Sequence, residues 1–165
     1  MSGAFHSAPH ARWLKTDALM PATDLATALF APGSVALVGA SADPEKNTAR
    51  PQRFLRKHGY AGRIVPINRQ RSSVLGEPAY PDLRTAPGPI DHAFIMVPAE
   101  TVPEVIAQCG ELKIPVATIY SDGFAERGEE GYRRQQRLVA LARASGVRLL
   151  GPNSMGVIKI GRAHV

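Results

Sequence analysis

The stretch that decides the fold is residues 34–57, which read SVALVGASADPEKNTARPQRFLRK. Residues 35–38 are all apolar, which is typical of a buried strand in a sheet that is covered on both faces. Gly39 ends this strand and a short polar turn follows it. Pro51 fits the first turn of a helix that we expect to end near Gly59. A strand, a short turn and a helix in this order are the usual opening of a nucleotide phosphate site.

The rest of the chain continues this alternation. Apolar runs predict further strands, and apolar residues three or four positions apart predict helices. The expected strands are residues 63–67, 93–97, 114–120 and 147–150, and the expected helices are residues 24–30, 102–109 and 129–145. Residues 68–89 are expected to form a long polar connection with one short turn around Asp82 and Leu83. This order predicts an α/β fold, a Rossmann-like, doubly wound, mainly parallel five-stranded sheet with helices on both faces.

Length and composition are typical of one soluble globular domain. The chain has 165 residues, of which 44% are hydrophobic and 21% are charged. No stretch approaches the roughly 18 apolar residues that would span a bilayer, and the first residues lack the apolar core of a secretory signal. Residues 1–22 have no clear period, and we interpret them as a loosely ordered N-terminal extension. We therefore predict a cytoplasmic protein that does not bind membranes.

The sequence offers few groups for catalysis or metal binding. Cys109 is the single cysteine, so an internal disulfide and a multi-cysteine metal site are excluded. It falls on the apolar stripe of its predicted helix, where we expect it to pack as a small hydrophobe. None of the histidines has a serine, cysteine or carboxylate at a spacing that suggests a nucleophile and its base. We predict no catalytic residue and no metal site in this chain.

Positive charge is concentrated in one part of the chain. The net charge is +6, and the segment from residue 46 to residue 71 contains no Asp or Glu. Its basic residues are Lys46, Arg50, Arg53, Arg56, Lys57, Arg63, Arg69 and Arg71. Such a run indicates an anionic partner that carries phosphate. Nucleic acid is not the expected partner, because only Phe54 and Tyr60 could stack on bases within the run.

A dinucleotide site is only partly matched. The fingerprint G-x-G-x-x-G requires three glycines, and only the first, Gly39, is present. An NAD site also has an acidic residue near the end of the second strand, where this chain has Asn68-Arg69-Gln70-Arg71. Guanidinium groups at this place suit a ribose that carries a phosphate. NADP carries one on the 2′ oxygen and coenzyme A (CoA) on the 3′ oxygen, and the arginines alone do not separate the two.

Four motifs stand in the order and at the spacings of a known family. They are FAPGSVALVGAS at 30–41, GYAGRIVPIN at 59–68, VPA at 97–99 and GPNSMG at 151–156, with SDGF at 121–124 between the last two. Together they resemble the CoA-binding domain of NDP-forming acyl-CoA synthetases, which are related to the succinyl-CoA synthetase α subunit. Fused protein lysine acetyltransferases of bacteria carry the same module. The resemblance covers about residues 25–160, although residues 47–52 replace the glycine and small apolar residues of many relatives.

The resemblance implies a task for each strand end. For the phosphates and the adenosine it implies Gly39, Ala40 and Ser41 at the first helix terminus, Lys46 beside the pyrophosphate, and Pro66, Ile67, Asn68 and Arg69 along the adenosine and its 3′-phosphate. For the remainder of the molecule it implies Val97, Pro98, Ala99, Ser121, Asp122 and Gly123 as walls beside the adenine and pantetheine, and Gly151, Pro152, Asn153 and Ser154 near the thiol. In open parallel sheets such a crevice lies outside the carboxyl ends of the strands.

The resemblance also implies that the chain is the N-terminal part of a larger ligase or acetyltransferase. In that family the chemistry uses a phosphorylated histidine in a second domain and an ATP-grasp domain, so ATP or ADP would bind only there. Residues 23–160 would then be the CoA-binding domain, and residues 161–165 the start of a linker. The partners would be a CoA thioester and the remaining domains or subunit, and this chain alone would bind CoA or acyl-CoA without turnover.

Two alternatives remain open at this point. The first is an oxidoreductase-type domain that prefers NADP, with Arg69 and Arg71 on the 2′-phosphate. The second is a stand-alone CoA-responsive binding protein, which would not be an enzyme.

Overall fold

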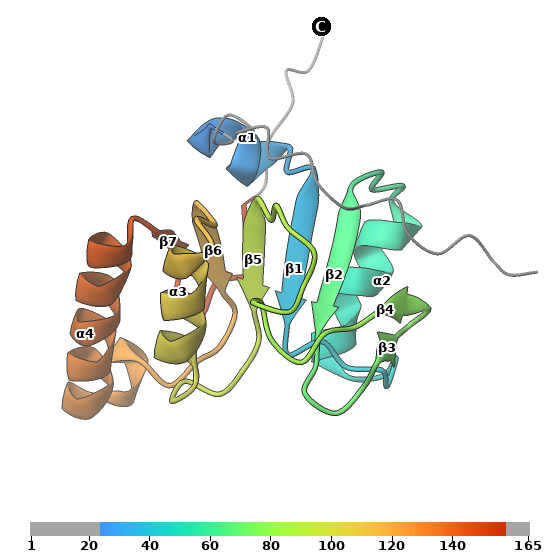
Figure 1. Cartoon of the computed structure of the whole chain (residues 1–165). Coiled ribbons are helices and arrows are strands. Elements are labelled where there is room, and N and C mark those ends of the chain that lie inside the picture. The colour runs from blue at the N-terminus through green and yellow to red at the C-terminus, as the bar shows by residue number, and fades with distance from the viewer. Residues whose placement is uncertain (1–23, 158–165) are drawn as a thin grey trace, which may run out of the picture.

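A computed structural model describes residues 24–157 of the chain. Its main sheet has five parallel strands in the order β2-β1-β5-β6-β7 (Figure 1). These strands are β1 (Ser34–Val38), β2 (Arg63–Ile67), β5 (His92–Ile95), β6 (Val116–Ile119) and β7 (Arg148–Leu150). The predicted fold class is confirmed. The predictions for residues 1–22 and 161–165 lie outside the described residues.

The helices begin and end where the local sequence directs. They are α1 (Leu25–Phe30), the short 3-10 helix η1 (Asn47–Ala49) leading into α2 (Arg50–Lys57), α3 (Val102–Glu111), the 3-10 helix η2 (Ala125–Arg127) and α4 (Glu129–Ser145). Asp24 caps α1, because its Oδ1 accepts from the backbone N–H groups of Ala26 at 2.9 Å and Thr27 at 3.1 Å. Gly146 ends α4 in the left-handed conformation that a helix C-terminus favours.

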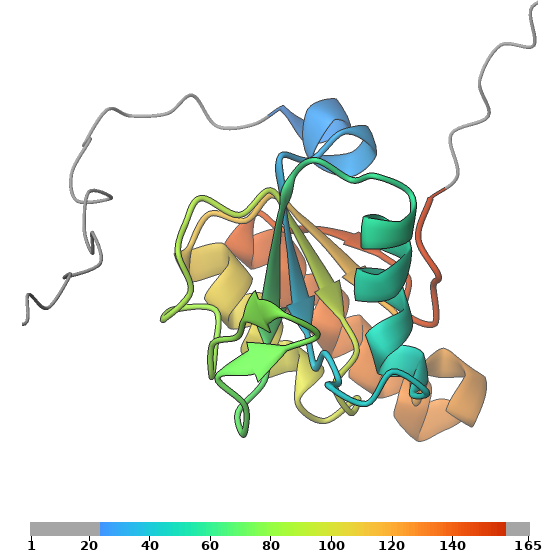
Figure 2. The ribbon, with the colours of Figure 1, turned by 90° about the vertical axis from the view of Figure 1, so that its right-hand side faces the viewer.

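The sheet separates two apolar cores. Along β1 the side chains alternate between its faces, as in any strand. Ala36 and Val38 pack in the core that contains α3 and α4, whereas Val35 and Leu37 pack in the core that α2 joins through Leu55. Figure 2 shows α2 on one face of the sheet and α3 on the other. The sheet is thus covered on both faces, which is why its strands read as nearly continuous apolar runs.

The strand order places a switch point between β1 and β5. From β1 the chain moves outward to β2, then crosses back to β5 on the other side of β1. Because parallel crossovers are right-handed, connections that run in opposite directions lie on opposite faces. The loops that leave β1 and β5 therefore diverge, and a ligand crevice is expected between their carboxyl ends.

The segment after β2 contains a hairpin that the sequence did not reveal. The sequence predicts a long polar connection over residues 68–89 without strands. This prediction is wrong at β3 (Ser73–Val74) and β4 (Glu77–Pro78), which pair antiparallel. Val74 is fully buried and its carbonyl accepts from Gln52 Nε2 at 2.8 Å. Strands of two residues are too short to show an apolar period, so only their packing against α2 reveals them.

Pro66 lies in the edge strand β2, as its missing N–H group requires. Its carbonyl accepts from Tyr80 N at 3.1 Å, and Asn68 N donates to Tyr80 O at 2.8 Å, so the connection partly covers this edge. Within residues 24–157, no helix is long and apolar enough to cross a membrane.

Candidate functional site

The five strand ends meet along one edge of the sheet. A methyl group on Gly39 would lie 3.1 Å from Val97 Cγ1, so the ends of β1 and β5 touch. The hydroxyl of Ser121 donates to the carbonyl of Val97, and Asn153 N donates to Ser121 O at 3.0 Å. This row of contacts joins Gly39 to Asn153 through β5 and β6. The structure therefore brings together the residues that the sequence placed at separate strand ends.

The turn after β1 is built around Gly39. This residue has φ +89°, and a side chain here would also meet Met96 O at 3.0 Å, so both conformation and space favour glycine. Ser41 Oγ accepts from Asp43 N at 3.0 Å, which leaves its O–H as a donor. Lys46 is exposed at the start of η1. A hydroxyl donor at Ser41 and a helix start thus flank this turn, and Lys46 is close by in the chain, which suits phosphate binding.

Asn68 ties the first two strand ends together. Its Nδ2 donates to Ala40 O at 2.8 Å, and its Oδ1 accepts from Gln70 N at 2.8 Å. Both ends of the amide are therefore used within the protein. We assign Asn68 the role of holding these two loops in place, in addition to any ligand contact of its backbone.

A cavity of about 290 Å³ lies at the ends of β1, β2 and β5. Its walls are Val38, Gly39, Ile67, Asn68, Arg69, Gln70, Pro81, Asp82, Val97, Pro98, Thr101, Val105 and Gln108. These walls include residues that the sequence predicted for the site at the ends of β1, β2 and β5. The ends of β6 and β7 are not among its walls, and they continue the edge beyond it.

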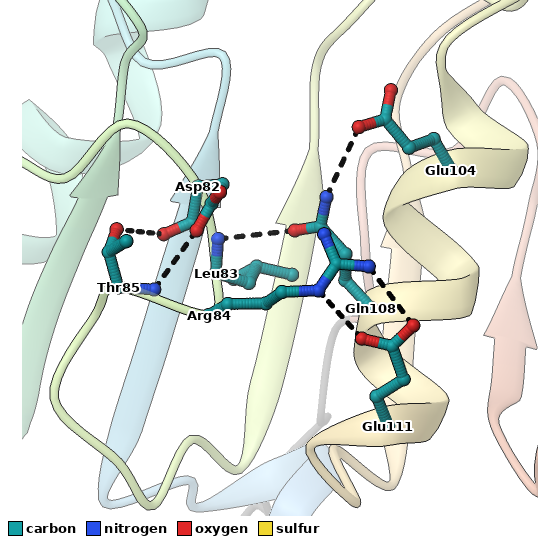
Figure 3. A network of polar contacts seen from close by, with 7 residues as sticks. All are labelled: Asp82, Leu83, Arg84, Thr85, Glu104, Gln108 and Glu111. Carbon is teal, nitrogen blue, oxygen red and sulfur yellow. Dashed lines mark hydrogen bonds and ion pairs between the residues drawn. The ribbon is translucent and has the colours of Figure 1, made fainter.

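A carboxylate stands at the corner where β2 ends, although the local sequence has none. Glu104, in the first turn of α3, accepts from Arg69 Nη2 at 3.2 Å. Figure 3 shows its place in a polar network that includes Gln108 and the turn after Asp82. Sequence reasoning missed Glu104 because it inspected only residues next to β2 in the chain. No local signal could have indicated that α3 supplies this group.

The loop after β6 is held by two charged residues that the sequence analysis also missed. Glu126 Oε1 accepts from Phe124 N at 3.0 Å and from Gly123 N, and these backbone bonds lower the pKa of Glu126. Arg134 Nη1 donates to Gly123 O at 2.6 Å. A glutamate two residues after SDGF was the available signal, since acidic side chains often accept from nearby turn amides. Asp122 pairs with Arg127 at 3.2 Å.

The loop after β7 packs closely on the end of β6. Gly151 has φ +94°, and a methyl group there would lie 2.7 Å from Ile119 O. Ser154 N donates to the same carbonyl at 3.0 Å. Asn153 adopts a left-handed conformation with φ 54°, which asparagine tolerates better than most residues. Gly-Pro-Asn-Ser is thus a compact turn against β6 at the far end of the crevice.

A second, apolar cavity of about 620 Å³ lies on the α2 side of the sheet. Phe54, Phe94, Tyr120 and Met155 are among its walls, and none of the predicted site residues is. His92 also lines it, with ring nitrogens 3.1 Å from Ala28 O and 2.7 Å from Thr118 Oγ1. Burial lowers the pKa of His92. These contacts give His92 a structural role.

The thiol of Cys109 is inert, and the described acidic groups form no metal-binding cluster. Cys109 is fully buried, and burial raises the pKa of its thiol to about 12, so the thiolate is not accessible at neutral pH. Among residues 24–157, no group of three or more His, Cys, Asp or Glu side chains could hold a metal ion.

Known proteins are similar to this chain in sequence. The family model of the CoA binding domain matches residues 33–159. The ADP-forming acetate–CoA ligase II of Archaeoglobus fulgidus is 39% identical over 130 residues, covering 79% of this chain and 19% of the ligase. The α subunit of the ADP-forming acetate–CoA ligase I of Pyrococcus furiosus is 42% identical over 135 residues, covering 79% of this chain and 29% of the subunit.

Solved structures of other proteins are also similar to this chain. Acetyl-coenzyme A synthetase 1 of Ca. Korarchaeum cryptofilum superimposes with a TM-score of 0.70 and 36% identity, over 74% of this chain and 26% of that protein. The chain thus spans less than a third of these relatives. The family predicted from the four motifs is confirmed, since its model matches most of the chain and every strand of the sheet. The chain belongs to the CoA binding domain family.

Proposed function

We propose that this chain binds CoA or acyl-CoA in the crevice at the carboxyl ends of its strands, as the coenzyme-binding part of an ADP-forming acyl-CoA ligase. The observation that carries this proposal is the row of contacts from Gly39 through Val97 and Ser121 to Asn153. An extended molecule with phosphates at one end and a thiol at the other needs such a continuous edge.

The positions of the basic side chains support one direction of the coenzyme along this edge. The phosphates lie over Gly39, Ala40 and Ser41, with Lys46 close to the pyrophosphate. The adenosine takes the cavity of about 290 Å³, with Arg69 at its rim beside the 3′-phosphate. The pantetheine passes Pro98, Ala99 and the loop 121–123. The thiol ends near the turn 151–154, which carries the exposed Asn153.

The chemistry of the ligase lies outside this chain. Two curated relatives are named as acetate–CoA ligases, and the matching region is 19% and 29% of their length. We propose that the remaining parts of such a protein bind ATP or ADP and transfer the acyl group, and that this chain presents the coenzyme to them. Cytoplasmic location remains a prediction from the sequence.

Isothermal titration calorimetry tests the binding. We expect CoA to bind in the micromolar range, and Arg69→Gln to weaken it by roughly three- to tenfold, the net contribution of about one hydrogen bond at a partly exposed place. Arg133→Gln removes an exposed arginine of α4 that pairs with Glu129, and it should leave the affinity unchanged. A folded protein that binds no CoA would reject the proposal, and binding of NADPH in its place would select the oxidoreductase alternative.

A further inference from the structure

An ion pair occupies the corner of the crevice where β2 ends. Arg69 Nη2 donates to both carboxylate oxygens of Glu104, at 3.2 Å to Oε2 and 3.4 Å to Oε1. The side chains are 70% and 54% exposed. Arg69 lines the cavity of about 290 Å³ and meets any ligand that enters there, whereas Glu104 pairs with it from outside the walls of that cavity.

The scaffold holds Glu104 more firmly than it holds Arg69. Gln108, one helical turn further along α3, is 3% exposed, and its Nε2 donates to Glu104 Oε1 at 3.4 Å. Gln108 Oε1 accepts from Leu83 N at 3.2 Å (Figure 3). A backbone N–H group can be met only by the amide oxygen, so the amide nitrogen must face Glu104. The orientation of Gln108 is thereby fixed.

A second ion pair anchors the same turn to α3. Arg84 Nε and Nη2 donate to the two carboxylate oxygens of Glu111 at 2.7 and 3.0 Å (Figure 3). Asp82 closes the turn by accepting from Thr85 N at 2.9 Å. The turn therefore keeps its place beside Gln108, which contacts Glu104, whereas Arg69 is a long side chain that can swing between partners.

A ribose phosphate would compete with Glu104 for Arg69. A guanidinium binds carboxylate and phosphate through the same N–H groups, so both anions cannot occupy them fully at once. A phosphate that arrives must therefore displace the carboxylate from the guanidinium before it can use those N–H groups.

We propose that Glu104 is a specificity-determining residue, which holds Arg69 until a ribose phosphate displaces it and so lowers the affinity for the phosphorylated ribose. The proposal rests on the CoA-binding function proposed above. A ligand without the 3′-phosphate gains nothing from Arg69, and its affinity is independent of the pair. Glu104 thus reduces the preference for CoA over the same molecule lacking this phosphate.

Calorimetry with CoA and 3′-dephospho-CoA tests this on the full chain at low ionic strength. We expect Glu104→Gln to bind CoA roughly two- to fivefold more tightly, the range of one exposed ion pair, and to bind 3′-dephospho-CoA as the wild type does. The control is Glu129→Gln, which also removes a carboxylate from the first turn of a helix and from an exposed ion pair. It should change neither affinity.

A double-mutant cycle tests whether Arg69 carries the effect. In an Arg69→Gln background, Glu104→Gln should leave the affinity for CoA unchanged. A gain that persists in this background shows direct repulsion of the ligand and overturns the proposal. The proposal is also overturned if Glu104→Gln, shown by circular dichroism to be folded, binds CoA no more tightly than the wild type does. It is likewise overturned if the variant binds CoA and 3′-dephospho-CoA more tightly by the same factor. A wild type that binds no CoA rejects the proposed function, and this inference with it.

Discussion

Asn68 Nδ2 lies 2.8 Å from the carbonyl oxygen of Ala40 and joins the ends of β1 and β2. The two strands are neighbours in the sheet, and Gly39 N also donates to Ile67 O at 3.0 Å. The side chain of Asn68 therefore adds a second link between the two loops where the phosphates are proposed to bind.

Asn68→Asp should destabilise the protein and weaken CoA binding. The substitution replaces the donor by a carboxylate oxygen that faces the Ala40 carbonyl, so the bond is lost and the charge repels a phosphate. We expect a loss of about 1–3 kcal/mol in the free energy of unfolding, measured by urea denaturation. Gln136→Ala is the control, because Gln136 is an exposed amide side chain on α4 and is not among the walls of the cavity. Equal stability of wild type and Asn68→Asp would show that the bond has no structural role.

Gly39→Ala should destabilise the fold more than Gly59→Ala. Both glycines have positive φ, +89° and +71°, so both substitutions strain the backbone. Only at Gly39 does the new methyl group meet another part of the chain, with Met96 O at 3.0 Å, whereas the space beside Gly59 is open. The difference between the two melting temperatures isolates the contact. If both variants melt together, the ends of β1 and β5 do not pack as closely as the structure shows.

Stability should fall in acid partly because of Glu126. Its pKa is lowered from the ordinary 4.5, first by the hydrogen bond from Phe124 N. A group whose folded pKa is depressed stabilises the protein above its unfolded pKa and loses that contribution as the pH falls through the folded value. Urea denaturation between about pH 6 and pH 3 should therefore show a shallower decline for Glu126→Gln than for wild type. Glu129→Gln serves as the reference, and an unaltered slope in Glu126→Gln would contradict the assignment.

Cys109 should react with thiol reagents only when the protein opens. It is fully buried on α3, and burial raises its thiol pKa to about 12. Because it is the single cysteine of the chain, the labelling signal has one source. We expect labelling by a chromogenic disulfide to be slow in buffer and fast in denaturing urea. Rapid stoichiometric labelling in buffer would show that α3 is not packed on the sheet as described.

The elements of the fold could be predicted because their signals are local. The apolar run before Gly39 indicated β1, and the apolar stripe that ends at Cys109 indicated α3. Each signal depends on side-chain period or backbone restriction within a few residues. The β3–β4 hairpin was not predicted, because two-residue strands are too short to show an apolar period and depend on packing against α2.

The candidate site was predicted as a set of strand ends, but not as a set of contacts. Sequence reasoning correctly placed Gly39 and Asn153 on one edge, since parallel strands end together. It missed Glu104, Glu126 and Arg134, which reach the edge from helical segments. Their positions depend on how α3, η2 and α4 pack, and this packing cannot be predicted from the sequence of any single segment.

The sequence by itself determined the alternation of strands and helices, the phosphate-suited turn after β1 and the absence of a carboxylate next to β2 in the chain, because these follow from neighbouring residues. Only the tertiary structure decided that a carboxylate, that of Glu104, nevertheless lies at the end of β2. Arg69 and Glu104 are 35 positions apart, and they meet because the chain crosses from β2 to β5 and α3 begins at the same edge of the sheet where β2 ends. Contacts of this kind depend on the strand order, which no local pattern encodes.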